Sequence, residues 1–249
     1  MVVVYHPHPD APGSNLAALT GLAHARIEAD WASFVDAART ASVAVLFAPV
    51  VDPALRAKLA YLAWTLGPIP IVLLSDEQSG EGGGLPLDAV LTCADARWSL
   101  PAVIDRLKAV PRRARLASLV AGVFADAHTE VRHALCWLLE AEEPARSAVD
   151  LVSHVFCDRS TLYRAWESTA AHKRGVSLHQ IVNQALAIRT AELAEKRRSR
   201  WRIAADLGID GERLATLLDP SLARSREDPV HAACLAFWTL IRSDPPTGA

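Results

Sequence analysis

The segment His6-Pro7-His8-Pro9-Asp10 follows the first apolar run of the chain and holds three side chains that could bind a metal ion. His6, His8 and Asp10 stand at alternate positions, so an extended loop would bring their imidazoles and carboxylate to one side. Imidazole and carboxylate are ligands for Zn²⁺ and Fe²⁺. A complete site would need further His or Asp residues, and no second cluster of that type is evident. Because Pro7 and Pro9 explain the segment as a stiff loop, we predict neither a metal nor another cofactor.

A second group of side chains suits contact with phosphates and base edges. Arg159, Ser160, Tyr163 and Arg164 fall within six residues and offer guanidinium and hydroxyl donors, which are the groups that contact DNA in many proteins. A basic run follows later in the chain and would hold the DNA backbone through Arg197, Arg198, Arg200 and Arg202.

Two short helices must position the first group. One apolar face begins with Leu151, Val152 and Val155, and Asp158 is suited to cap the next helix. In that second helix the inward positions are Leu162, Ala165 and Trp166, which leaves the four polar side chains outside. This spacing is typical of a helix-turn-helix, whose second helix enters the major groove. An ordinary pair of packed helices remains the alternative.

The same inward spacing occurs a second time, with Asp210 in the capping position. The apolar and small residues of this copy are Ile203, Ala204, Leu207, Gly208, Ile209, Leu214 and Leu217. Its outward face holds Gly211, Glu212, Ala215 and Thr216, with Arg213 as the one candidate base. Phosphate repels an acidic face, so we expect the second unit to support the first.

Two such units joined by a helix resemble the DNA-binding domain of AraC-type transcriptional regulators, over roughly residues 128 to 225. The resemblance implies base contact by Arg159, Ser160, Tyr163 and Arg164. The equivalent positions of the second unit are Gly211, Glu212 and Thr216. This chain departs from the family in a linking helix about one turn shorter and in Phe156, which replaces the turn glycine of the first unit.

The N-terminal part alternates apolar strands with helical patterns. The strands are expected in MVVVY, ARIEA, VAVLFAPV, IPIVLLSD and DAVLTCAD, and the helices in NLAALTGLA, WASFVDAART, DPALRAKLAYLAWTLG and WSLPAVIDRLKA. Apolar strands covered on both faces predict a five-stranded parallel sheet with flanking helices. This pattern resembles the receiver domain of response regulators, a flavodoxin-like fold.

A receiver needs acidic residues after its first and third strands, a hydroxyl after its fourth and a lysine after its fifth. The corresponding places hold Tyr5 and His6, Phe47 or Ala48, Ser75, and Cys93 or its neighbours, so only Ser75 matches. We therefore expect a pseudo-receiver that works without phosphorylation. A small-molecule effector in the crevice at the ends of these strands remains an alternative to a closed sheet edge.

Composition and charge agree with a globular regulator. The chain of 249 residues is 51% hydrophobic and carries a net charge of −2. Residues 146–202 nevertheless hold 11 basic and 5 acidic side chains, against 7 and 11 in residues 1–110. Four scattered cysteines without a CxxC predict reduced thiols, and no apolar run reaches the length of a membrane span, so we expect a cytoplasmic protein.

These observations predict an α/β domain over residues 1–110, a connecting or dimerisation helix over 111–127 and an all-α DNA-binding domain over 128–249 with two helix-turn-helix units. One apolar stripe runs from Leu116 to Leu138. Arg112, Arg113 and Arg115 at its start could contact phosphate or simply lie on the surface. We expect a non-enzymatic regulator that binds double-stranded DNA as a homodimer and senses a protein partner or small molecule through its N-terminal domain. The alternative is an adaptor protein that has lost DNA binding.

Overall fold

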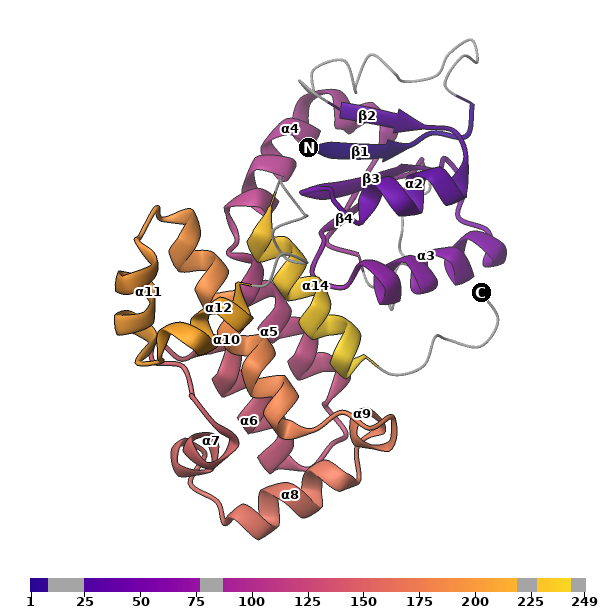
Figure 1. Ribbon diagram of the computed structural model, residues 1–249. Coiled ribbons are helices and arrows are strands. Elements are labelled where there is room, and N and C mark those ends of the chain that lie inside the picture. Colours follow the sequence, from indigo (N-terminus) through magenta and orange to yellow (C-terminus); the bar gives the residue numbers. More distant parts are fainter. Residues whose placement is uncertain (9–24, 77–86, 219–227, 243–249) are drawn as a thin grey trace. The chain divides into compact units, whose positions relative to one another are not determined.

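The structure, a computed structural model, describes residues 1–8, 25–76, 87–218 and 228–242 (Figure 1). The chain divides into two compact units, with the boundary between Pro111 and Arg112. The first unit is an α/β domain and the second is entirely helical. No helix in the described part of the chain has the length and apolar character needed to cross a membrane.

The α/β unit contains a five-stranded, all-parallel sheet, which confirms the prediction from the apolar runs. Its strands are β1 (Val2–Tyr5), β2 (Ala25–Glu28), β3 (Val43–Phe47), β4 (Ile71–Leu74) and β5 (Ala89–Leu91), in the order β2-β1-β3-β4-β5. Val3 pairs with Arg26 on one side and with Ala44 on the other, and Val45 pairs with Val72. The segment NLAALTGLA lies outside the described residues.

Helices cover both faces of the sheet because alternate strand residues point to opposite sides. Val3 and Leu46 face α2 (Trp31–Ala38) and α3 (Pro53–Leu66), while Val4 and Val45 face α4 (Cys93–Ala109). Asp52 caps α3 by accepting a hydrogen bond from the backbone N–H of Leu55 at 2.6 Å. Its carboxylate is therefore part of a helix start.

The apolar stripe in the middle of the chain forms two helices instead of one. α5 (Arg112–Val123) and α6 (Thr129–Glu140) pack against each other, and the chain turns between them at residues 124–128. Leu116, Ala117 and Val120 of α5 lie in the core of the helical unit. We expected a connecting or dimerisation helix here, whereas α5 belongs to the helical unit because its apolar face is already buried there.

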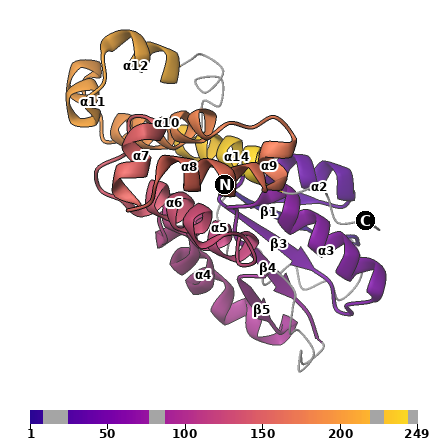
Figure 2. The same cartoon turned by 90° about the horizontal axis from the view of Figure 1, so that it is seen from below.

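The rest of the helical unit is organised around α10 (Leu178–Glu195), which packs against α14 (Pro229–Ile241). A capping box of Ser177 and Gln180 starts α10. Before it come α7 (Ala148–His154), α8 (Arg159–Glu167) and α9 (Ala170–Lys173), and after it α11 (Arg200–Leu207) and α12 (Gly211–Leu217). In Figures 1 and 2, α11 and α12 form a lobe at the edge of this unit. That lobe has a small core of its own around Ile203, Leu207 and Leu214.

Candidate nucleic-acid interface

The first helical pair, α7 and α8, buries one face of α8 in the core of the helical unit. Leu162, Ala165 and Trp166 are buried, as their spacing predicts. The indole N–H of Trp166 donates a hydrogen bond of 2.9 Å to the carbonyl of Val176, just ahead of α10. A buried indole needs such an acceptor, so Trp166 fixes the rotation of α8 about its own axis.

The opposite face of α8 presents three polar side chains to solvent. Arg159, Ser160 and Arg164 are exposed, and the Arg164 Nε donates to the carbonyl of Ser160 at 3.2 Å. Tyr163 departs from the prediction because it is only half-exposed and packs against the core. The Arg159 guanidinium lies 5.3 Å from the centre of the Tyr163 ring, within the range of a cation–π contact. The ring of Tyr163 therefore helps to position the guanidinium group of Arg159.

The turn between α7 and α8 contains an unusual backbone conformation. Phe156 has φ of 53°, in the left-handed region that favours glycine, and its side chain is 93% exposed. Asp158 occupies the N-cap position of α8, but its carboxylate makes no capping hydrogen bond, contrary to our expectation. Burial raises the pKa of the neighbouring Cys157 thiol, with further contributions from Glu130 and Asp158, so this thiol stays neutral near pH 7.

The second helical pair, α11 and α12, repeats the pattern of the first pair 52 residues later in the chain, so that residue 199 corresponds to residue 147. Ser147 and Ser199 cap the first helix of each pair, and Phe156 and Gly208 both have positive φ at the turn. Further equivalent positions are Leu151 and Ile203, Val155 and Leu207, Asp158 and Asp210, and Leu162 and Leu214. Unlike Asp158, Asp210 does cap its helix, by accepting from the backbone N–H of Arg213 at 2.7 Å.

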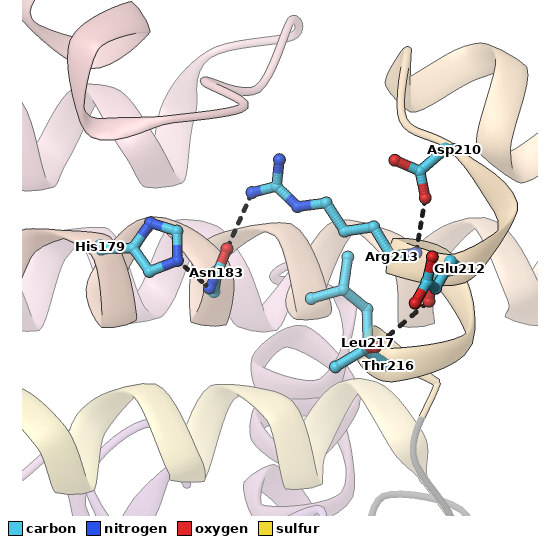
Figure 3. A pocket seen from close by; sticks show the side chains of 7 residues that line it. All are labelled: His179, Asn183, Asp210, Glu212, Arg213, Thr216 and Leu217. Carbon is cyan, nitrogen blue, oxygen red and sulfur yellow. Dashed lines mark hydrogen bonds between the residues drawn. The ribbon is translucent and has the colours of Figure 1, made fainter.

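Arg213, the one basic side chain of α12, points toward α10 (Figure 3). Its guanidinium donates to the side-chain oxygen of Asn183 at 2.8 Å and to the carbonyl of Arg146 at 2.6 Å. A cavity of about 460 Å³ lies beside this contact, between α10 and α12. Figure 3 shows the side chains that line it, which also include His179, Asp210, Glu212, Thr216 and Leu217. The exposed residues of α12 are then Gly211, Glu212, Ala215 and Thr216, and none of them is basic.

The basic run after α10 is exposed but partly neutralised. Arg198 and Arg202 both pair with Asp206, with 3.5 Å between the Arg202 Nε and the carboxylate. Arg197 has φ of 54°, and Arg200 begins α11. All four guanidinium groups lie at the surface, so they keep access to a phosphate, but two of them would have to share or leave Asp206.

The arginines at the start of α5 have structural partners. Arg112 forms an ion pair with Asp228 and lies 2.8 Å from the Nδ1 of His231, which ties α5 to α14. Arg113 pairs with Glu192 at 3.0 Å and also donates to the carbonyl of Leu139. The sequence left phosphate contact and simple surface charge open as roles for these side chains. Neither role describes Arg112 and Arg113, because both side chains are mostly buried in these contacts.

The carboxyl edge of the sheet is closed by packed side chains. The imidazole of His6 is buried and stacks on Phe47 with 4.3 Å between ring centres, and its Nδ1 accepts from the backbone N–H of His8 at 3.2 Å. Ser75 donates to the carbonyl of Pro49 at 3.1 Å. Burial and a hydrogen bond with Asp76 raise the pKa of the Cys93 thiol to about 12. Asp10 lies outside the described residues, and within them no three potential ligands gather around a metal position.

Two residues that matter for this geometry were missed by sequence reasoning. Arg146 links the helical pairs, since its carbonyl accepts from Arg213 and a Cβ added at Gly208 would lie 2.5 Å from its guanidinium carbon. Trp201 is 76% exposed on α11. The constant offset between the pairs could have identified Trp201 as an outward position, because it is equivalent to the exposed Val149.

Comparisons with family models, with curated proteins and with solved structures found no match to this chain.

Proposed function

We propose that this protein is a DNA-binding transcriptional regulator whose helical unit resembles that of AraC-type regulators. In this proposal each helical pair is a helix-turn-helix, and α8 of the first pair enters the major groove. The observation that carries the proposal is the division of α8 into two faces. Leu162, Ala165 and Trp166 anchor one face in the core, while Arg159, Ser160 and Arg164 are exposed together on the other.

The chemistry of the exposed face suits DNA. Arginine can donate two hydrogen bonds to a guanine edge, and serine can contact a base or a phosphate. The position of Arg159 at the first residue of α8 agrees with the way reading helices offer their N-terminal residues to the groove. Arg197, Arg198, Arg200 and Arg202 would add backbone contacts, which contribute affinity without sequence preference.

The second pair contributes support in this proposal. α12 lacks an exposed base because Arg213 bonds to α10 and to Arg146, and Glu212 would face phosphate with the same sign of charge. A single reading helix per chain favours a homodimer on two half-sites about one helical turn of DNA apart.

The α/β unit is proposed to be a pseudo-receiver. Its strand order β2-β1-β3-β4-β5 is the order of flavodoxin-like sheets. His6, Phe47 and Cys93 stand where a receiver carries its acidic and basic phosphorylation residues, and all three pack into the sheet edge. The unit would therefore act through dimerisation or a partner and not through a phosphoaspartate.

Binding to a labelled random-sequence duplex at fixed, low salt tests the proposal. We expect Arg159→Ala/Arg164→Ala to weaken binding by at least about tenfold, because two contacts of roughly 1 kcal/mol each are lost. The matched control is Arg106→Ala/Lys108→Ala, which removes the same charge from exposed positions of α4. Equal losses in both variants would show that only net charge matters and would contradict the assignment of α8.

An adaptor protein without DNA binding is the second candidate. The non-basic face of α12 favours it. An adaptor would leave the duplex free even at low salt, whereas the regulator binds it and releases it as salt rises.

A further inference from the structure

The two helical pairs differ in the side chains at equivalent positions of their second helices, α8 and α12. In the first pair, α8 carries Arg159 and Tyr163, and the guanidinium of Arg159 lies 5.3 Å from the centre of the Tyr163 ring. The equivalent positions in the second pair are Gly211 and Ala215, which carry no such side chains. A cavity of about 500 Å³ lies beside them, between α11 and α12. We call it the α11–α12 groove.

The lining of the α11–α12 groove is mostly apolar. Small residues of both helices line it, and Ile209 and Leu214 add larger apolar surface; the small residues are Ala204, Ala205, Gly211 and Ala215. Small side chains allow the backbone of another segment to approach closely. Ala215 stands at the position where the first pair has the aromatic ring of Tyr163.

Two side chains at the rim indicate the chemistry of an occupant. Trp201 lines the groove and is 76% exposed, and tryptophan is one of the residue types enriched among the strongest contacts of protein interfaces. Arg200 also lines the groove and has no ion-pair partner within the described residues, whereas Arg198 and Arg202 share Asp206. The rim therefore offers an aromatic wall and an available positive charge.

We propose that the α11–α12 groove binds an amphipathic helical segment of a partner protein. The segment inserts a large apolar or aromatic side chain over Gly211 and Ala215, in the place that Tyr163 takes in the first pair. A carboxylate of the segment pairs with Arg200, so the segment is acidic.

The properties of the groove favour a protein segment over a small molecule or DNA. A small-molecule pocket encloses most of its ligand, but here Trp201 stays largely open to solvent. DNA is disfavoured because the lining is mostly apolar and contains one basic side chain, Arg200. This proposal does not rest on base reading by α8, because Arg159 and Arg164 take no part in the groove; Arg200 is the one residue that it shares with the proposed DNA-backbone contacts.

Filling the groove tests the proposal without disrupting the fold. Ala215→Tyr combined with Gly211→Arg transfers the side chains of the first pair to the second. A Cβ at Gly211 meets no atom within 4 Å, so the substitution fits the backbone. Thr216→Tyr is the matched control, because it adds the same ring at the next exposed position of α12, outside the α11–α12 groove.

The probe is a labelled helical peptide of about four turns, with Trp and Leu on one face and Glu on the other. We expect the full-length protein to bind it, Ala215→Tyr/Gly211→Arg to weaken binding at least about tenfold, and Thr216→Tyr to leave it unchanged. Arg200→Glu should weaken binding of this peptide and strengthen binding of a matched peptide with Lys in place of Glu.

Several results would overturn the proposal. These are no peptide binding, binding that survives groove filling, equal binding of a peptide with Ala in place of Trp and Leu, and displacement of the peptide by indole-3-acetate. Self-association of the protein that disappears on groove filling, with no peptide binding, would assign the groove to a second copy of this chain. None of these results bears on Arg159 or Arg164, so the proposal of DNA binding would stand or fall separately.

Discussion

At the scale of single residues, Phe156 combines a strained backbone with an exposed apolar side chain. A left-handed conformation costs a residue with a Cβ roughly 1 kcal/mol, and an aromatic ring that is 93% exposed gains little from burial in return. Strain of this kind persists where another role requires the side chain. Its equivalent in the second pair is Gly208, which adopts the same conformation without that cost.

Replacing Phe156 by glycine should therefore stabilise the helical unit. We expect the free energy of unfolding to rise by about 1 kcal/mol, because glycine tolerates positive φ. Amide hydrogen exchange of the slowest amides in α7 and α8 measures this change. Gly208→Ala, the mirror substitution, should lower stability by about 1 kcal/mol or more. A loss of stability in Phe156→Gly would show that the ring makes a stabilising contact in the folded protein.

His6 makes the stability of the α/β unit depend on pH. Burial lowers the pKa of its imidazole, and the nearby charge of His8 lowers it further, from an ordinary value of 6.5. As pH falls below about 6.5, the unfolded chain takes up a proton that the folded protein excludes, so the free energy of unfolding falls. The loss continues until pH reaches the lowered pKa and then stops, because both states are protonated below it.

A pH series of urea unfolding measures this contribution. His6→Phe keeps an aromatic ring against Phe47 but cannot bind a proton. The wild-type α/β unit should lose more stability between about pH 7.5 and pH 5 than the His6→Phe variant does. An identical pH dependence in the two proteins would mean that His6 titrates normally or not at all in this range.

At the scale of elements, Arg213 fixes the second helical pair to the rest of the helical unit. Its guanidinium joins α12 to Asn183 of α10 and to the carbonyl of Arg146 ahead of α7. The small core of the lobe also packs against Leu193 of α10, and Leu217 lies in the main core of the helical unit, so these hydrogen bonds add a polar contact to an apolar attachment.

Arg213→Met should loosen α11 and α12 selectively. We expect a loss of about 2 kcal/mol in local stability, since hydrogen bonds from a charged donor contribute roughly 1.5–3 kcal/mol. Hydrogen exchange should accelerate in α11 and α12 while α8 stays protected. Arg202→Met is the control, because its ion pair with Asp206 is solvent-exposed and should change stability by less than about 1 kcal/mol. Uniform acceleration throughout the helical unit would contradict a local role for Arg213.

The sequence predicted elements well where one strong pattern decided them. Apolar runs identified β1, β3, β4 and β5, the segment ARIEA was correctly expected to form β2, and alternation along β1 places Val3 and Val4 on opposite faces. The break between α5 and α6 escaped prediction because residues 124–128 contain neither proline nor glycine, and the apolar stripe continues through them.

The candidate interface was predicted in its position but not in its details. Helical spacing separates inward Leu162 from outward Arg159, and so it gave the exposed face of α8. Spacing alone does not reveal that Tyr163 folds under Arg159 or that Arg213 reaches Asn183. Long polar side chains choose their partners from other elements, and a local pattern carries no information about those partners.

At the scale of the whole molecule, charge is concentrated in one part of the chain. Residues 146–202 carry six more basic than acidic side chains, although the net charge of the protein is −2. The acidic balance elsewhere limits non-specific attraction to nucleic acid, so binding should depend on a small number of phosphate contacts. The slope of affinity against salt counts these contacts.

The decisive measurement is therefore the slope of log K against log salt for duplex DNA, in wild type, Arg159→Ala/Arg164→Ala and Glu212→Ala. We predict a steep slope for wild type and a slope shallower by up to about 2 for the α8 variant. The slope for Glu212→Ala should stay unchanged, because the proposal has α8 and not α12 contact DNA. Absence of binding by wild type at the lowest salt, or a slope that changes for Glu212→Ala and not for the α8 variant, would contradict DNA reading by α8.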